Sequence, residues 1–400
     1  MSGMNFLERL LDGVAVEWKP LGEIGEFVRG SGLQKSDFTD SGIGCIHYGQ
    51  IYTFYGDYAY QTKSFVSSTL ATKLRKAQKN DLIIATTSEN IEDVCKTLVW
   101  LGEEEVCVSG ETYIFKHNQN PKYLAYYLKT PSFFDFKKRN RTGTKVIRVH
   151  GDRLATFQIP IPCPDNPDRS LVIQAEIVRI LDTFTALTAE LTAELTAELS
   201  DLKKQYNYYR DRLLTFEEGE VEWKTLGEIG EILRGTAITE KEANSGDYPV
   251  VANGPSHNYF HDQSNRSGET IVIARSGVYA GLVSYWDIPI FLTDAFSIHP
   301  DNNALSSKFL YYVLKNDQTK IHNMSKGAGV PHVRAKEFES YKVPVLPLEE
   351  QARIVAILDK FNTLTTSISE GLPREIALRQ KQYEYYRDLL LSFLKPEEEQ

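Results

Sequence analysis

The chain of 400 residues contains two stretches of sequence that each occur twice. Residues 16–26 begin Val-Glu-Trp-Lys and return almost unchanged at 221–231, and residues 174–182 return in closely similar form at 351–359. The order of segments is therefore A-B-A′-B′. Internal repetition constrains the fold strongly, because similar segments build similar modules. Between the repeated stretches the sequences differ, which predicts a shared frame that carries two different globular bodies.

The two B segments are predicted to be long helices. Apolar residues in 174–216 recur at steps of three or four, and this spacing averages to the α-helical period. Residues 351–393 form a segment of equal length with a matching apolar face. We therefore expect the two helices to pack antiparallel, like a coiled coil. Gly371 and Pro373 predict a kink or short break near Glu370, because proline lacks a backbone donor and clashes with the preceding turn.

The two A segments are predicted to be compact mixed domains. Each contains an apolar strand, a short helix, a glycine-bearing loop and a closing strand rich in proline. The strands and helices are expected at 81–86, 122–129 and 159–162 in the first A segment, and at 270–275, 308–315 and 343–347 in the second. The common order of elements predicts one architecture for both segments despite their unlike sequences.

The predicted fold class is α+β, with a pseudo-twofold internal repeat. Two globular α/β-mixed domains are expected to be separated by two long antiparallel coiled-coil-like helices. The predicted division is 1–173 for the first domain, 174–216 for the central helix, 217–350 for the second domain and 351–400 for the distal helix with its acidic tail at 397–399.

Composition restricts the class of protein. The chain is 42% hydrophobic and 25% charged, which is typical of soluble proteins with sizeable cores. It contains no apolar run long enough to span a bilayer, and its N-terminus lacks a signal pattern, so we expect a cytoplasmic protein. The four cysteines include no Cys-x-x-Cys pair, which favours reduced thiols over a disulfide framework or a zinc site.

Basic residues near the glycine-bearing loops are the candidates for DNA contact. The net charge of −9 disfavours nucleic-acid binding, but residues 137–148 carry six basic residues and no acid. Glycine also lets backbone amides approach phosphates closely. The candidates are Arg29, Lys137, Lys138, Arg139, Arg141, Thr144, Lys145, Arg148, Arg234, Arg275, Lys326, His332 and Arg334. The alternatives are a turn with solvated charges for the loops, a shared fold constraint for Arg29 and Arg234, and an ordinary salt bridge for Arg275.

Two further features lie on the predicted helices. The tetrapeptide Thr-Ala-Glu-Leu occurs three times in succession at 188–199, and the candidate spacer-setting residues are Thr188, Leu191, Thr192, Leu195, Thr196 and Leu199. One tetrapeptide turns a helix by ~40° beyond a full rotation, close to the roughly 35° of one DNA base pair, so the repeats could set a spacing along DNA. The alternative is a repeat that arose by replication slippage. The candidate partner-docking residues are Tyr206, Tyr209, Tyr383 and Tyr386, with packing between the helices as the alternative.

Other classes of function find less support. The chain contains no Asn-Pro-Pro-aromatic tetrad of a methyltransferase, no phosphate-binding loop and no His-Glu-x-x-His metal helix. Pro164-Asp165 and Glu222-Trp223-Lys224 are only loosely similar to a metal-dependent nuclease arrangement. A two-headed structural scaffold would also need a rod and two heads, and the different basic loops of the two bodies argue mildly against it. We therefore assign no catalytic and no metal-binding residue.

The A-B-A′-B′ pattern resembles the specificity (S) subunits of type I restriction-modification enzymes along essentially the whole chain. The Thr-Ala-Glu-Leu repeats, together with Gln-Tyr-Asn-Tyr-Tyr-Arg-Asp at 205–211, are similar to the type IC subfamily. The resemblance implies that 16–173 and 221–350 are target recognition domains, each of which reads one part of a bipartite double-stranded DNA sequence. It also implies that the two helices bind two modification (M) subunits. An alternative is a DNA-binding protein outside restriction-modification.

The same resemblance implies that this chain is non-catalytic and binds no cofactor itself. S-adenosylmethionine would serve adenine methylation in the M subunits, and ATP and Mg would serve translocation and cleavage in the restriction (R) subunits. In the family, the number of Thr-Ala-Glu-Leu copies is linked to the spacer between half-sites, and three copies are similar to the longer-spacer form. The resemblance does not reveal which bases are read.

Overall fold

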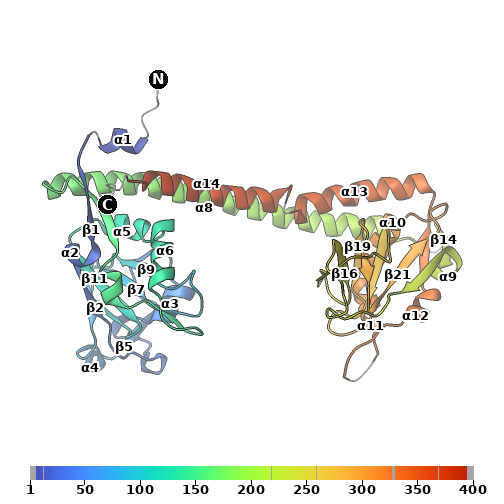
Figure 1. Ribbon diagram of the computed structural model, residues 1–400, viewed down its shortest axis with the longest axis horizontal. Helices are drawn as coiled ribbons and strands as arrows, with labels where there is room; N and C mark the ends of the chain where they lie inside the picture. The colour runs from blue at the N-terminus through green and yellow to red at the C-terminus, as the bar shows by residue number, and fades with distance from the viewer. Residues whose placement is uncertain are drawn as a thin grey trace. The chain divides into compact units, whose positions relative to one another are not determined.

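The computed structural model describes residues 6–11, 13–217, 219–257, 259–326, 329–367 and 369–393 (Figure 1). The acidic tail at 397–399 and the loop residues 327–328 lie outside the described residues. Contacts divide the chain into two compact units. Unit 1 contains 1–192 and 378–400, and unit 2 contains 193–377. Each unit therefore joins one A segment to parts of both B segments, while the four-part division expected from the sequence remains a prediction.

Unit 1 contains two sheets and two isolated strand pairs. The sheet of order β2-β11-β7-β9-β4 is formed by β2 (Gly25–Arg29), β4 (Tyr58–Ala59), β7 (Leu82–Ala85), β9 (Lys96–Trp100) and β11 (Thr112–His117). The sheet of order β5-β3-β10-β6 is formed by β3 (Ile43–Ile46), β5 (Ser64–Val66), β6 (Lys76–Ala77) and β10 (Val106–Val108). The pairs are β1 (Val16–Pro20) with β13 (Gln158–Pro162), and β8 (Thr87–Ser88) with β12 (Ile147–Arg148).

Short helices connect the strands of unit 1. They are α1 (Phe6–Leu11), α2 (Leu21–Ile24), α3 (Tyr48–Thr53), α4 (Ser68–Ala71), α5 (Pro121–Tyr127), α6 (Pro131–Asn140) and α7 (Gly151–Leu154), with a 3-10 turn at Lys35–Asp37. Helix α5 begins with Asn120 as its cap and proline at its first position, a combination that satisfies the free amides of a helix start. Its tyrosines are buried in the core of the unit.

Unit 2 repeats this plan with fewer elements. Its sheets have the orders β15-β21-β18-β19 and β17-β16-β20, and β14 pairs with β22. The strands are β14 (Glu222–Thr225), β15 (Gly230–Arg234), β16 (Tyr248–Val251), β17 (Tyr259–His261), β18 (Thr270–Ala274), β19 (Val283–Trp286), β20 (Phe291–Leu292), β21 (Ala295–Pro300) and β22 (Lys342–Val345). The short helices are α9 (Leu226–Ile229), α10 (Ser307–Asn316), α11 (Gln318–Asn323) and α12 (Ala335–Glu339).

The two units share one antiparallel core topology. The run β2-β11-β7-β9 in unit 1 corresponds to β15-β21-β18-β19 in unit 2, and every pairing in both runs is antiparallel. The repeated Val-Glu-Trp-Lys strand closes each body against a proline-bearing strand: Trp18 pairs with Pro160, and Trp223 with Pro344. The strands and short helices predicted from the sequence are thus confirmed in both units.

The long helices are α8 (Pro167–Leu214), α13 (Leu348–Thr366) and α14 (Leu372–Leu390). Helix α8 is continuous, whereas the distal segment is broken as predicted, with Gly371 at φ +85°. A side chain at Gly371 would place its Cβ 2.6 Å from the carbonyl oxygen of Thr363, so glycine is needed there. None of the described helices combines the length and apolar character needed to cross a bilayer.

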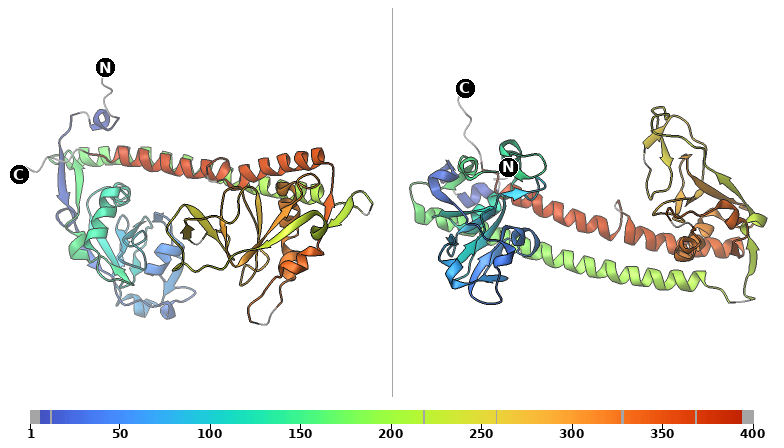
Figure 2. Two further views of the ribbon diagram at one scale, coloured as in Figure 1. Left: turned by 45° about the vertical axis from the view of Figure 1, so that its right-hand side comes forward. Right: turned by 90° about the horizontal axis from the view of Figure 1, so that it is seen from below.

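The predicted antiparallel packing occurs within each unit. In unit 1, α14 runs beside α8 in the opposite direction (Figures 1 and 2), and Phe184 stacks on Tyr386 with ring centroids 5.8 Å apart. In unit 2, Tyr209 of α8 stacks on Phe361 of α13 with centroids 5.7 Å apart. The apolar stripes of the helices are therefore covered in part, while Leu187 and Leu378 remain exposed.

A buried glutamine joins the long helix to the body in each unit. The Oε1 atom of Gln174 accepts a hydrogen bond from the backbone N–H of Asn120 at 2.9 Å, and that of Gln351 accepts one from Ser306 at 2.8 Å. Asn120 and Ser306 are the residues that cap α5 and α10. Both glutamine side chains are fully buried. Each therefore satisfies a partly buried amide at the start of a helix.

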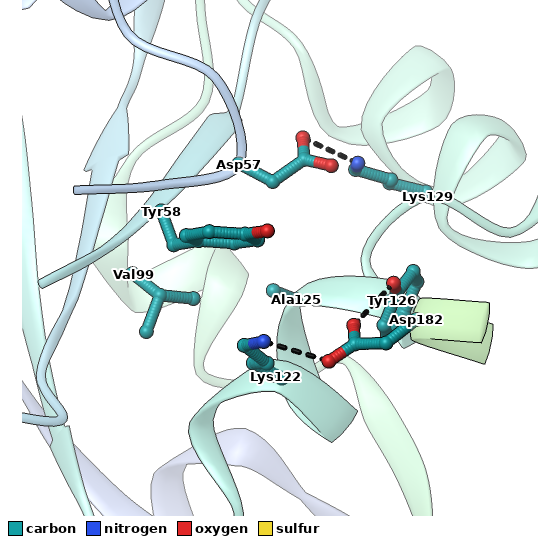
Figure 3. A pocket seen from close by; sticks show the side chains of 8 residues that line it. All are labelled: Asp57, Tyr58, Val99, Lys122, Ala125, Tyr126, Lys129 and Asp182. Atoms are coloured by element: carbon teal, nitrogen blue, oxygen red, sulfur yellow. Dashed lines mark hydrogen bonds and ion pairs between the residues drawn. The ribbon is translucent and has the colours of Figure 1, made fainter. Parts of the chain in front are cut away.

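A carboxylate two turns further along makes a second connection. In unit 1, Asp182 accepts hydrogen bonds from Lys122 Nζ and from Tyr126 Oη, both at 2.7 Å (Figure 3). In unit 2, Asp359 accepts one from Tyr312 and lies 3.5 Å from Lys308 Nζ. We call the glutamine and the aspartate of each unit its anchor pair. The glutamine and the aspartate of the repeated sequence Gln-Ala-x-Ile-Val-x-Ile-Leu-Asp thus make equivalent contacts in both units.

Replacing a glutamine of an anchor pair should destabilise its own unit. Gln174→Leu removes the acceptor for Asn120 and leaves that partly buried amide without a partner, at a cost of about 1–3 kcal/mol. Hydrogen exchange should rise in 120–128 and stay unchanged in 306–316, and Gln351→Leu should give the reverse pattern. Gln205→Leu, at an exposed position of α8, is the control. Equal effects of the three variants would contradict the assignment.

Candidate nucleic-acid interface

Each unit presents one short hairpin with the same closing geometry. Thr142 and Arg148 exchange two backbone hydrogen bonds, at 2.8 and 2.9 Å, and Lys326 and His332 exchange two at 3.0 Å. Both pairs of bonds close at the bases of the predicted glycine-bearing loops, and residues 327–328 of the second loop lie outside the described residues. In unit 1 the loop residue Gly143 adopts φ +83°, a conformation that favours glycine. The bases of the two predicted loops are thus closed in the same way.

The hairpin of unit 1 carries exposed cationic side chains. Arg141, Thr144 and Lys145 are exposed, and neither Arg141 nor Lys145 forms an ion pair with any residue that the structure describes. Lys138 and Arg139 are exposed on the preceding helix α6, next to this hairpin in sequence. These side chains are available to a polyanion, because no carboxylate of the described residues pairs with them.

One predicted contact in this segment is wrong. Lys137 is only 7% exposed, and its Nζ donates to the backbone carbonyls of Glu92 at 2.6 Å and Val94 at 3.0 Å. Burial lowers the pKa of its ammonium group. Lys137 therefore holds helix α6 against the loop that precedes β9 and is not available to DNA. The six basic residues look alike in the sequence, but helix α6 turns the side chain of Lys137 toward the core and those of Lys138 and Arg139 toward solvent.

Two arginines of unit 1 contact neighbouring residues of the turn that precedes β11. The exposed Arg29 donates from Nε to the carbonyl oxygen of Gly110 at 3.1 Å. Arg148 places its Nε 3.6 Å from the Glu111 carboxylate, which also accepts a hydrogen bond from Thr87 Oγ1 at 2.6 Å. The predicted residues Arg29 and Arg148 thus lie at one site, although 118 positions separate them in the sequence.

Unit 2 has a corresponding set of side chains. Arg275 follows β18 and places its Nη1 3.4 Å from Oδ1 of Asp294, so the salt bridge considered as an alternative is present. At the base of the hairpin, Lys326 Nζ lies 2.9 Å from Glu337. The side chain of His332 is half-buried, and its Nδ1 lies within hydrogen-bond distance, 2.7 Å, of the carbonyl oxygen of Val330. Arg234, at the end of β15, and Arg334, which precedes α12, are exposed.

The sequence did not single out Glu111 and Asp294, which organise the two sites. Each stands directly before the strand that pairs with the central strand of its sheet, β11 in unit 1 and β21 in unit 2. A lone acid before a strand is ordinarily a solvated residue. Only the strand register shows that the two carboxylates occupy equivalent positions.

The tyrosines of the long helices divide by exposure. Tyr206 packs against Phe361, and Tyr383 Oη accepts a hydrogen bond from Thr185 at 3.0 Å, which supports the packing alternative for these two. Tyr209 and Tyr386 also stack on partner helices but remain 42% and 40% exposed. Their role in partner docking stays a prediction. The more exposed neighbours, Tyr208 at 59% and Tyr385 at 64%, were not among the docking candidates.

Among the candidate residues, Lys137 lines a pocket of about 370 Å³ together with Glu92, Cys95 and Phe133. A pocket of unit 1, shown in Figure 3, lies between two cation–carboxylate pairs, Lys122 with Asp182 and Lys129 with Asp57. Its volume of about 10 Å³ is room for one water. Within the described ranges, no three His, Cys, Asp or Glu side chains are grouped closely enough to hold a metal ion. The surface around the hairpins is therefore the candidate site.

Comparison with known proteins agrees with the resemblance inferred from the sequence. Residues 14–201 and 218–378 match the family described as type I restriction modification DNA specificity domain. The chain is 39% identical to the EcoR124I/EcoR124II specificity subunit of Escherichia coli, over 99% of both chains. It is 34% identical to the EcoprrI specificity subunit of Escherichia coli, over 92% of this chain and 93% of the relative.

Solved structures show the same fold at low sequence identity. A chain from a structure on complex assembly and conformational transition of the type I restriction-modification system has a TM-score of 0.66 at 16% identity, with 95% of this chain and 98% of that chain covered. The HsdS subunit from Thermoanaerobacter tengcongensis has a TM-score of 0.56 at 16% identity, with 94% and 95% covered. Family match, sequence identity and fold agree, and the chain belongs to the DNA specificity subunits of type I restriction-modification systems.

Proposed function

We propose that each unit reads one half of a bipartite DNA target through the surface around its hairpin. The observation that supports this most directly is the presence of one equivalent hairpin in each unit, with different exposed side chains on the two. A shared backbone frame places the hairpins alike, whereas different side chains select different bases. The target would accordingly be asymmetric, with one half-site for each unit.

The chemistry of the complex is proposed to reside in partner subunits. Two modification subunits would bind the long helices and methylate adenine with S-adenosylmethionine, after the base is flipped out of the duplex. Restriction subunits would use ATP and Mg for translocation and cleavage. This division requires no cofactor in the present chain and places it with DNA in the cytoplasm. The assignment to the type IC subfamily remains a prediction from the Thr-Ala-Glu-Leu repeats.

The three tetrapeptides are proposed to set the spacing of the two half-sites. Residues 188–199 lie inside α8, which continues through them without a break. Removing four residues from a helix changes its length by ~6 Å and its rotation by ~40° beyond a full turn. This rotation is close to that of one base pair, although the translation exceeds the ~3.4 Å of a base-pair step, so bending or sliding must absorb the difference.

Exchange of one body should change one half-site. If residues 16–173 are replaced by the same segment of another specificity subunit, the complex with its modification subunits should methylate a new sequence in one half and keep the other. Mapping of methylated adenines across a genome measures this. The matched exchange of 221–350 should alter the other half. A change in both half-sites from a single exchange would refute the modular assignment.

Deletion of one tetrapeptide should shorten the preferred spacer by one base pair. The variant lacks 192–195, so the helix beyond the deletion is rotated by ~40°, and methylation of duplexes that differ only in spacer length is the measurement. A deletion of three residues rotates it by ~60° in the opposite sense and serves as the contrast, because it should impair methylation at every spacer. An unchanged spacer preference after removal of 192–195 would sink the proposal.

Loss of the unpaired hairpin cations should weaken DNA binding of every sequence alike. In the double variant Arg141→Ala with Lys145→Ala, two phosphate contacts would be lost, so the slope of log affinity against log salt should fall by about 2. The control is Lys73→Ala with Lys79→Ala, two exposed cations outside the hairpin. An unaltered salt slope in a folded hairpin variant would show that this surface does not contact DNA.

A further inference from the structure

We propose that Arg148 in unit 1 and Arg275 in unit 2 read guanine bases and that the carboxylates of Glu111 and Asp294 hold them in position. This inference rests on the proposed function and goes beyond it. It distinguishes, among the cations of each site, the residue that recognises a base from the residues that hold phosphates.

The strand register places one carboxylate at the same point of each sheet. In unit 1, Glu111 precedes Thr112, which pairs with Ala85. Two residues beyond Ala85, Thr87 donates its hydroxyl to the Glu111 carboxylate at 2.6 Å. The carboxylate is thereby fixed at the end of the strand, where Arg148 reaches it from the neighbouring hairpin.

Unit 2 builds the same arrangement from different residues. Asp294 precedes Ala295, which pairs with Ala274, and two residues beyond Ala274 the hydroxyl of Ser276 lies 3.4 Å from the Asp294 carboxylate. Arg275 reaches this carboxylate from the strand end itself, not from the hairpin. The position of the acid is thus shared by the two units, while the element that supplies the arginine differs.

The environment of Arg275 fixes its backbone as well. Asn253 accepts hydrogen bonds through Oδ1 from the backbone N–H groups of Arg275, at 2.7 Å, and Ser276, at 3.0 Å. The same side chain donates from Nδ2 to Asp294 at 2.5 Å. Both ends of the Arg275–Asp294 pair are therefore tied to one asparagine, which limits the directions in which the guanidinium can point.

A carboxylate beside an arginine favours base reading over phosphate binding. It cancels the positive charge that counterion release depends on, so the pair contributes little general affinity for DNA. What it contributes is orientation, because a carboxylate 3.4–3.6 Å from one guanidinium nitrogen attracts the group to that side and leaves its other N–H groups directed away from the carboxylate. Guanine offers O6 and N7 to such a bidentate donor in the major groove. Arg148 and Arg275 both remain more than half exposed, at 51% and 54%, so their free edges are open to a base.

The neighbouring cations fit the complementary role. Arg141 and Lys145 have no ion pair with any described residue and sit on the hairpin of unit 1. A mobile, uncompensated cation suits a phosphate, which needs charge more than direction. Each site would then combine cations that bind phosphates of the duplex with one oriented arginine that hydrogen-bonds to a guanine.

Charge-conserving substitutions test this assignment in the complex with the modification subunits. Arg148→Lys keeps the charge but cannot donate two parallel hydrogen bonds. Discrimination at one G·C pair of one half-site should therefore fall by roughly tenfold or more, with an unchanged salt slope and an unchanged second half-site. Arg275→Lys should affect one pair of the other half-site. Arg153→Lys, at an exposed arginine that lies 4.0 Å from the Asp152 carboxylate and has no assigned DNA contact, is the matched control and should leave both halves unaffected.

The measurement is the affinity of each variant complex for duplexes that carry every single-base change of the mapped target, at several salt concentrations. Glu111→Gln gives an independent readout, because it frees the charge of Arg148 while it loosens its orientation. General affinity and salt slope should rise while discrimination at that G·C pair falls. A carboxylate that merely stabilises the fold would leave discrimination unchanged.

Two outcomes separate failure of this inference from failure of the proposed function. If the unsubstituted complex discriminates both half-sites and Arg148→Lys and Arg275→Lys discriminate equally well, the arginine assignment is wrong and the proposed function stands. The same holds if both variants weaken all duplexes alike. If exchange of neither body changes the DNA sequence that the unsubstituted complex recognises, the units do not read the target. The proposed function itself then fails.

Discussion

The hydrogen bonds of the two anchor pairs determine how each globular body is attached to the long helices. A buried glutamine, Gln174 or Gln351, satisfies the cap of the short helix, and an aspartate two turns later binds a lysine and a tyrosine of the same helix. These are directional contacts, unlike the apolar packing that surrounds them. They fix the rotation of the body about the helix, and the proposed reading of a split DNA target requires that rotation to be constant.

From the anchored helix the chain leads directly to the candidate interface. In unit 1, α5 is followed by α6 and then by the hairpin, and in unit 2, α10 is followed by α11 and its hairpin. Few residues separate the anchor from the candidate interface in either unit. A rigid attachment at one end of this segment therefore restricts the other end, where the proposed contacts with base edges require placement within a fraction of an ångström.

Much of the fold was predictable from repeated residues and from periodicity. Both features depend on local sequence, so the strands at 82–85 and 270–274, the helices and the break at Gly371 all follow from it. The residues of the anchor pairs could also have been singled out from the sequence, because Gln and Asp recur at the same places in both copies of the repeated segment. Their partners were not, since the contact between Asp182 and Tyr126 depends on how two helices meet.

The interface was predictable only in part. The equivalence of the hairpins followed from their glycines and flanking cations, but Lys137 was misassigned because a basic run does not reveal which side chain faces inward. The carboxylates of Glu111 and Asp294 escaped notice because strand pairing alone makes them equivalent. Long-range pairing is the physical reason why sequence reasoning identifies elements more securely than sites.

The central claim is that each hairpin lies on its own half of a split DNA target. It is tested most directly by placing a photoreactive group at the tip of either hairpin, through Thr144→Cys or Val330→Cys in a cysteine-depleted chain assembled with its modification subunits. Mapping of the crosslinked nucleotides should show that the group at 144 reacts in one half-site and the group at 330 in the other. Crosslinks from both positions to the same half-site, or to neither, would contradict the account.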